Sequence, residues 1–183
     1  MPEARTALLR DAGATRELGR ILGGALRPGD VLALCGPLGA GKTTLVQGLA
    51  EAIGVPPSIA VNSPTFAVCA EYAAPLPLLH VDLYRLDSAD EAEAIGLPER
   101  LGDPDLLAVV EWADRIPEIL PRHTLWLRLE PEEGGRRVSL WEGDAGDVSW
   151  IEDAVLPESG GDERWTSTTI QMLADDSSSP SSC

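Results

Sequence analysis

The sequence predicts an α/β protein with a central, largely parallel sheet, helices on both sides and a closing antiparallel pair of strands. Short apolar segments alternate with segments of helical periodicity over its 183 residues, which suffice for one domain. A glycine-rich turn joins the first apolar segment to a helical one, and two later apolar segments each end at a carboxylate. Parallel sheets carry ligand sites at such strand ends.

The first part of the chain predicts two helices around one buried strand. Residues 1–10 form an arm or an edge strand. Asp11 is the expected N-cap of a helix over residues 11–26, which Pro28 and Gly29 end. The apolar run 31–35 predicts a buried strand. A second helix is expected over residues 42–53, with Gly54 after it.

The second part predicts the remaining strands. Residues 58–64 read as a loop, followed by strands over 66–72, 78–83 and 106–110. Ser88 is a predicted N-cap, and a short helix is expected over 114–120. The closing strand pair is expected over 124–129 and 137–141, joined by the turn at Gly134 and Gly135.

The charge of the chain is negative and unevenly distributed. The net charge is −16, and residues 142–183 hold ten acidic residues and one arginine. We therefore divide the chain into a domain over residues 1–141 and an acidic, Gly/Ser-rich tail over 142–183, which we expect to be disordered. An acidic chain repels phosphate backbones, so autonomous binding to DNA or RNA is disfavoured.

The sequence contains no apolar run of membrane-spanning length and no apolar leader segment near its first residues. We expect a cytoplasmic protein that does not contact a membrane. Its three cysteines have no metal-binding spacing.

The glycine-rich turn fits the phosphate-binding pattern G-x-x-x-x-G-K-[ST], which is typical of P-loop NTPases. Glycines at this turn allow successive N–H groups to face one anion, and the following helix adds the positive end of its dipole. Lysine then contacts the β- and γ-phosphates and threonine binds Mg²⁺. The predicted nucleotide ligands here are Gly36, Gly39, Ala40, Gly41, Lys42 and Thr43.

The single lysine of the chain supports this assignment. Thirteen of the fourteen basic residues are arginine, and Lys42 occupies the phosphate-binding position. The guanine-specific Asn-Lys-x-Asp motif requires a second lysine and is therefore excluded. The expected cofactors are ATP and Mg²⁺.

Two carboxylates are candidates to complete the site, because each ends an apolar run. Asp82 follows one strand and Glu111 another, and either carboxylate could serve the metal or orient the attacking water. Ser63 and Thr65 lie in the preceding loop, where a hydroxyl can sense the γ-phosphate. His80 is interpreted as a packed strand residue.

These residues resemble one family. GPLGAGKTTLVQGL, SPTF, HVDLYRL and VVEW together are similar to motifs of the bacterial TsaE (YjeE) ATPases, over about residues 11–141. The resemblance implies an ATP-hydrolysing subunit needed for threonylcarbamoyl-adenosine modification of tRNA. It implies action with the TsaD–TsaB heterodimer and contact with tRNA only through those partners.

The resemblance also implies roles for individual residues. Lys42, Asp82 and Glu111 would be catalytic, and Thr43, Asp82 and Glu111 would serve the metal. Thr44 would contact the phosphates together with Lys42 and Thr43. Asp11 and Thr15 would lie near the adenine, and Arg136 would approach the nucleotide. Two alternatives remain at this point: a small-molecule or nucleoside kinase, and a nucleotide switch that organises partners without hydrolysis.

Overall fold

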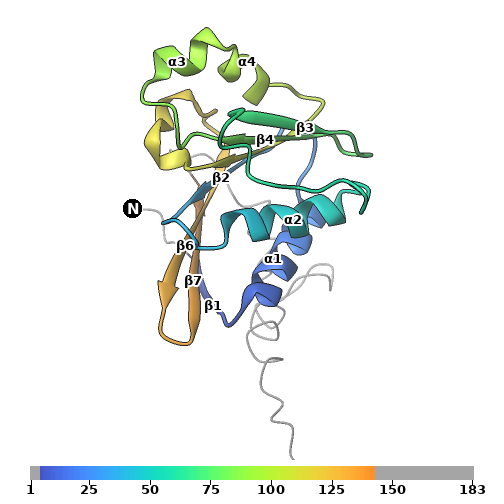
Figure 1. Ribbon diagram of the computed structural model, residues 1–183, viewed down its shortest axis with the longest axis vertical. Coiled ribbons are helices and arrows are strands. Elements are labelled where there is room, and N and C mark those ends of the chain that lie inside the picture. Colours follow the sequence, from blue (N-terminus) through green and yellow to red (C-terminus); the bar gives the residue numbers. More distant parts are fainter. Residues whose placement is uncertain (1–4, 143–183) are drawn as a thin grey trace, which may run out of the picture.

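The computed structural model describes residues 5–142, which form a seven-stranded sheet with helices on both faces (Figure 1). The strand order is β1-β7-β6-β2-β5-β4-β3. The strands are β1 (Arg5–Leu9), β2 (Val31–Cys35), β3 (Cys69–Tyr72), β4 (Leu78–Asp82), β5 (Leu107–Glu111), β6 (Thr124–Glu132) and β7 (Gly135–Glu142). The α-helices are α1 (Ala12–Ala25), α2 (Lys42–Ala52), α3 (Ala89–Ala94) and α4 (Leu97–Leu101), and two 3₁₀ turns cover Ala113–Arg115 and Pro117–Ile119.

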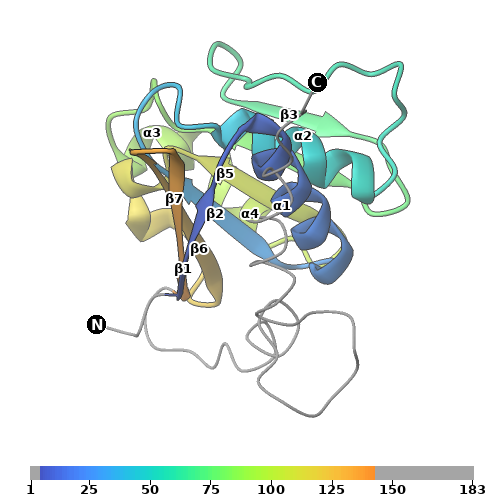
Figure 2. The same cartoon turned by 90° about the horizontal axis from the view of Figure 1, so that it is seen from below.

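The four central strands run parallel, and antiparallel strands close both edges. β6, β2, β5 and β4 are joined by parallel pairing. β3 pairs antiparallel with β4, whereas β7 and β1 extend the opposite edge beyond β6 (Figure 2). The predicted fold class, the edge strand near the start of the chain and the closing strand pair are confirmed.

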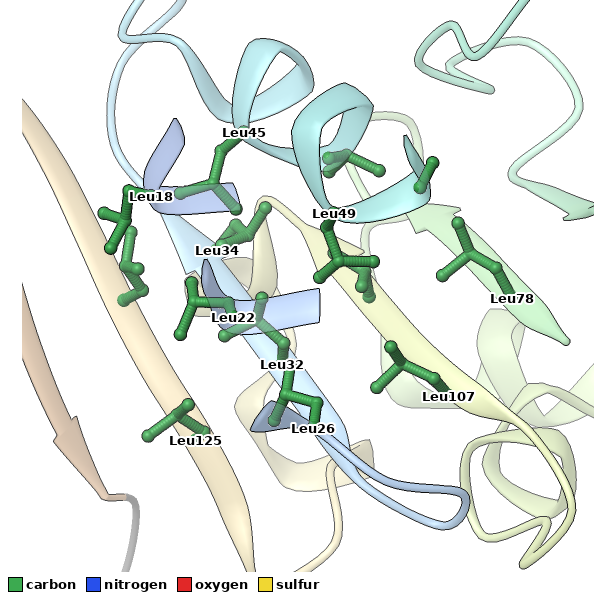
Figure 3. Packing of buried hydrophobic residues seen from close by; sticks show 14 of the residues in the cluster. Leu18, Leu22, Leu26, Leu32, Leu34, Leu45, Leu49, Leu78, Leu107 and Leu125 are labelled. Atoms are coloured by element: carbon green, nitrogen blue, oxygen red, sulfur yellow. The ribbon is translucent and has the colours of Figure 1, made fainter. Parts of the chain in front are cut away.

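The core lies in two apolar layers, one on each face of the sheet. Leucines of α1 and α2 pack on β2, β4, β5 and β6 (Figure 3). The opposite layer joins α3, α4 and the 3₁₀ turns to the alternate residues of the same strands. The central strands are buried on both faces, which explains their continuous apolar sequences.

Glycines set the distance between α1 and α2. A Cβ atom at Gly48 would overlap the carbonyl oxygen of Arg16, and one at Gly19 would overlap that of Leu45. These two helices therefore pack backbone against backbone. The contact brings the start of α1 beside the glycine-rich turn.

The predicted starts and ends of both long helices are confirmed. The Asp11 carboxylate accepts a hydrogen bond of 2.8 Å from the Ala14 N–H, as expected of an N-cap. Helix α2 begins at Lys42, and Gly54 follows it with a φ of +91°. Ser88 caps α3 through the N–H of Glu91.

The predicted strand over residues 66–72 is too long. Only Cys69–Tyr72 form β3, whereas Phe66 is 85% exposed in a turn. Val68 has a φ of +66°, which interrupts an extended chain. The segment is instead tied to β4, because the Asp82 N–H donates to the Val68 carbonyl.

The predicted helix over residues 114–120 is replaced by two 3₁₀ turns. Pro117 disfavours helical torsions in the residue before it, and Ile116 adopts φ −139° and ψ 65°.

The acidic tail, for which disorder was predicted, lies outside the described residues except for Glu142, the last residue of β7. Within residues 5–142, the helices are too short and too polar to cross a bilayer.

Candidate nucleotide-binding site

The glycine-rich turn leads from the end of β2 into the first turn of α2. Gly36, Gly39 and Gly41 have φ angles of +130°, +77° and +107°, which favour glycine. A side chain at Gly36 would overlap the carbonyl oxygen of Leu129 on β6. These torsions give the turn the form predicted from its sequence.

Lys42 begins α2 and folds back over the turn. Its Nζ donates to the carbonyl oxygens of Gly36 and Pro37, at 2.7 and 3.0 Å. The residue is only 5% exposed, and burial lowers the pKa of its ammonium group below that of an ordinary lysine. The negative charges of Glu111 and Asp82 partly offset this lowering of the pKa.

The two predicted carboxylates meet because their strands are adjacent and in register. Asp82 on β4 pairs with Glu111 on β5 in the parallel ladder. Alternate residues of each strand share one face of the sheet, so Asp82 and Glu111 follow the apolar residues that pack against α2. Both carboxylates are buried beside the first turn of that helix.

Glu111 connects the helix to the sheet. Its Oε1 accepts a hydrogen bond from Thr43 Oγ1 at 2.9 Å, and Oε2 lies 3.2 Å from the same hydroxyl. His80 Nε2 lies 2.9 Å from Oε1 on the buried side. His80 is thus a buried strand residue, as predicted, and it also contacts Glu111.

Asp82 connects the loop before β3 to the same place. Its Oδ2 accepts hydrogen bonds from Ser63 and, at 2.8 Å, from Thr65. Its Oδ1 accepts from the Tyr84 N–H at 2.9 Å. The two predicted switch hydroxyls are thus in direct contact with a predicted metal-binding carboxylate.

These groups line a pocket of about 360 Å³. It contains all predicted turn residues from Gly39 to Thr44, both carboxylates and both switch hydroxyls. The lining residues are Leu38, Gly39, Ala40, Gly41, Lys42, Thr43, Thr44, Ser63, Thr65, Asp82, Tyr84, Glu111, Trp112 and Arg136.

Three predicted nucleotide ligands lie behind or beside this lining. Gly36 forms the base of the turn beneath Lys42. Thr15 is fully buried and lies 3.5 Å from Nη1 of Arg136, which reaches the pocket from β7. Asp11 is exposed, its carboxylate caps α1, and it does not line the pocket.

Trp112 and Tyr84 also line the pocket, although neither is among the predicted ligands. Trp112 has a φ of +58°, which is uncommon for a bulky residue and turns the chain directly after β5. Its ring lies 4.0 Å from Lys42 Nζ, within cation–π range, and 5.0 Å from the Tyr84 ring. Their positions in the sequence could have indicated both residues: Trp112 directly follows Glu111, and Tyr84 follows Asp82 by two residues.

The donor set fits Mg²⁺ bound together with phosphates. Thr43, Asp82 and Glu111 offer only oxygen atoms, the donors that Mg²⁺ prefers. Mg²⁺ usually takes its remaining ligands from phosphates and water.

Known proteins are similar to this chain in sequence and in fold. The family described as threonylcarbamoyl adenosine biosynthesis protein TsaE matches residues 9–138. A protein of that name from Streptomyces coelicolor is 40% identical over 163 residues, which are 87% of this chain and 99% of the relative. The Bacillus subtilis protein of that name is 44% identical over 112 residues, or 61% of this chain and 68% of the relative.

A solved structure agrees with these matches. The crystal structure of YdiB from Bacillus subtilis superposes with a TM-score of 0.70 at 29% identity, and covers 84% of this chain and 95% of that one. The match over residues 9–138 includes the glycine-rich turn, both carboxylates and Arg136. The chain belongs to the TsaE family, whose members are named for the biosynthesis of threonylcarbamoyladenosine in tRNA.

Proposed function

We propose that this chain is an ATP-binding and ATP-hydrolysing subunit that supports threonylcarbamoyl-adenosine modification of tRNA. The observation that carries the proposal is the meeting of Lys42, Thr43, Asp82 and Glu111 in one pocket at the start of α2. Membership of the TsaE family supplies the pathway. The excluded guanine motif favours ATP as the nucleotide.

The chain's own groups have distinct tasks in this proposal. The N–H groups from Gly39 to Thr44 and the dipole of α2 bind the phosphates, and Lys42 moves from its carbonyl partners to the β- and γ-phosphates. Mg²⁺, held through Thr43 and the carboxylates, would neutralise charge on the transferred phosphoryl group. Glu111 orients the attacking water or the metal's water, and Asp82 couples the site to Ser63 and Thr65.

We further propose that the TsaD–TsaB heterodimer is the partner, and that tRNA is contacted only through it. Two arginines lie near the pocket, and groups of the chain itself engage both. Arg115 donates to the Leu86 carbonyl and Asp87, 5.8 Å from the Tyr84 ring. Arg136 contacts Thr15 at the Gly41 side. Because both guanidinium groups are engaged in this way, we expect weak ATP hydrolysis by the isolated chain, which a partner increases by completing the site.

Separate measurements of binding and turnover test these roles. Lys42→Ala should weaken Mg·ATP binding by about 10- to 100-fold, because it removes a charged hydrogen-bond donor. Glu111→Gln should lower turnover by about 100-fold or more and weaken binding far less. Calorimetry and phosphate release measure the two effects. Equal losses of binding and turnover in Glu111→Gln would contradict its role, and phosphorylation of an added small molecule would favour a kinase.

A further inference from the structure

His80 is a fully buried polar residue beside the site. The residue lies on β4 and is 0% exposed. Its Nε2 lies 2.9 Å from Glu111 Oε1, and its Nδ1 has no hydrogen-bond partner within the described part of the chain. Burying an imidazole with one unpaired nitrogen costs folding free energy. The hydrogen bond with Glu111 is the polar contact that offsets this cost.

The direction of this hydrogen bond depends on which group carries the proton. An ionised carboxylate can only accept, so with Glu111 ionised, Nε2 carries the proton and donates it to Glu111. In a neutral imidazole, Nδ1 is then an unprotonated acceptor. The contact therefore predicts the Nε2–H tautomer.

Glu111 Oε1 is held from two sides by groups on different elements. Thr43 Oγ1 on α2 approaches it at 2.9 Å, and His80 Nε2 approaches at the same distance from β4. His80 cannot shift easily, because β4 is paired with β3 and β5 on either side. Its ring also lies 6.4 Å from that of Tyr72 on β3.

We propose that His80 is a positioning residue for Glu111: its Nε2–H holds the carboxylate in the orientation that Thr43 and the nucleotide site require. The inference rests on the proposed ATP hydrolysis. It assigns His80 no proton transfer, because the imidazole is fully buried and Nδ1 contacts no described polar group that could pass on a proton. Substrate binding would depend on His80 only weakly, because the phosphates contact the turn and Lys42.

The tautomer provides a direct test without nucleotide. The chain has only two histidines, His80 and the exposed His123, so long-range ¹H–¹⁵N NMR of the imidazoles can be assigned with a His123→Gln variant. We expect His80 to carry its proton on Nε2 in the full-length protein. In Glu111→Ala, the Nε2 and attached-proton signals should shift, while those of His123 stay unchanged. An Nε2 atom without a proton would overturn the proposal.

Two substitutions distinguish positioning from packing. In His80→Gln, the side-chain amide can place an N–H near the position of Nε2, whereas His80→Leu fills the space without a donor. We expect His80→Leu to lower kcat by about 10- to 100-fold with little change in KM, and His80→Gln to recover most of the loss. Thermal unfolding of both variants measures the structural cost. Wild-type kcat in His80→Leu, or equal losses in both variants at equal stability, would overturn the proposal.

The two proposals fail in different ways. Absence of ATP turnover in wild-type protein, with and without partners, would contradict the proposed hydrolysis. The position of the proton on His80 and its response to Glu111→Ala would still decide the His80–Glu111 contact. If His80→Leu does not fold, the tautomer and the kcat of His80→Gln decide it, and a His80→Gln variant without measurable turnover at wild-type stability would count against it.

Discussion

Lys42 is the residue on which the nucleotide assignment depends most. It is the only lysine in the chain, it begins α2, and it lies buried between two carbonyl oxygens and the Trp112 ring. Burial favours the neutral amine, so the pKa of Lys42 lies below the ordinary value for lysine. A buried ammonium that faces an open pocket is well suited to a multiply charged phosphate ligand.

Amine-directed labelling should report on this residue. Because the pKa of Lys42 is lowered, its free amine forms, and labelling accelerates, at a lower pH than for an ordinary lysine of pKa about 10.4. Saturating Mg·ATP should slow the labelling, because the bound phosphates would contact Nζ and shield it from the reagent. Peptide mass spectrometry separates Lys42 from the terminal amine, which serves as the internal control. Unchanged labelling in saturating Mg·ATP would contradict the assignment.

Local patterns predicted many of these residues, whereas long-range contacts remained hidden. The glycine-rich turn is contiguous, and Asp82 and Glu111 each end an apolar run, so the sequence alone points to them. The His80–Glu111 contact depends on the register of β4 and β5. The contacts of Ser63 and Thr65 with Asp82 depend on how a loop folds back over β4. Neither arrangement has a signature in residue spacing.

At the scale of elements, the packing of α1 against α2 supports the site. Gly48 of α2 contacts the backbone of Arg16, and Gly19 of α1 contacts that of Leu45. This close approach places Thr15 beside Gly41 and within reach of Arg136. The helical periodicity identified both helices, but it could not show that glycines form their interface.

A matched pair of glycine substitutions tests this packing. Gly48→Ala should lower the free energy of unfolding by about 1–3 kcal/mol or more, because its Cβ would overlap a backbone oxygen. Gly24→Ala in α1 is the control: a Cβ there meets no atom within 4 Å, and alanine should stabilise the helix by about 0.5–1 kcal/mol. Urea unfolding measures both. Equal effects of the two substitutions would contradict the close helix contact.

Element boundaries were predicted well where sequence and burial agree. The strands β2, β4 and β5 are buried on both faces and match their apolar runs. The strand predicted over 66–72 was too long, because the apolar Phe66 is exposed and Val68 has a positive φ. Such residues fit a strand pattern, and only their tertiary setting shows that the chain turns there.

At the scale of the whole molecule, the topology explains how distant segments form one site. β2 lies at the centre of the sheet between β5 and β6, so the turn after it lies beside the end of β5 and beside Leu129 of β6. Glu111 ends β5, and Asp82 ends β4 one strand further out. The parallel arrangement brings these strand ends to one edge, which is the usual location of ligand sites in such sheets.

We expect the described part of the chain to be sufficient for the fold and for nucleotide binding. All seven strands and both apolar layers lie within residues 5–142. A protein ending after Glu142 should therefore unfold at nearly the same temperature as the full chain and bind Mg·ATP with similar affinity. Calorimetry on both proteins tests this. A large loss of stability or affinity would show that residues 143–183 contribute to the domain.

ATP turnover by the full-length protein, measured alone and with the TsaD–TsaB heterodimer, decides whether the site hydrolyses ATP in a partner-dependent way. Glu111→Gln with the same partners controls for hydrolysis by contaminating enzymes. The site geometry and the family predict slow hydrolysis by the isolated chain and a several-fold higher rate with the partners, which Glu111→Gln abolishes. Equal rates with and without TsaD–TsaB would contradict the proposed activation by the partners. ATP binding without any turnover in their presence would contradict the proposed hydrolysis.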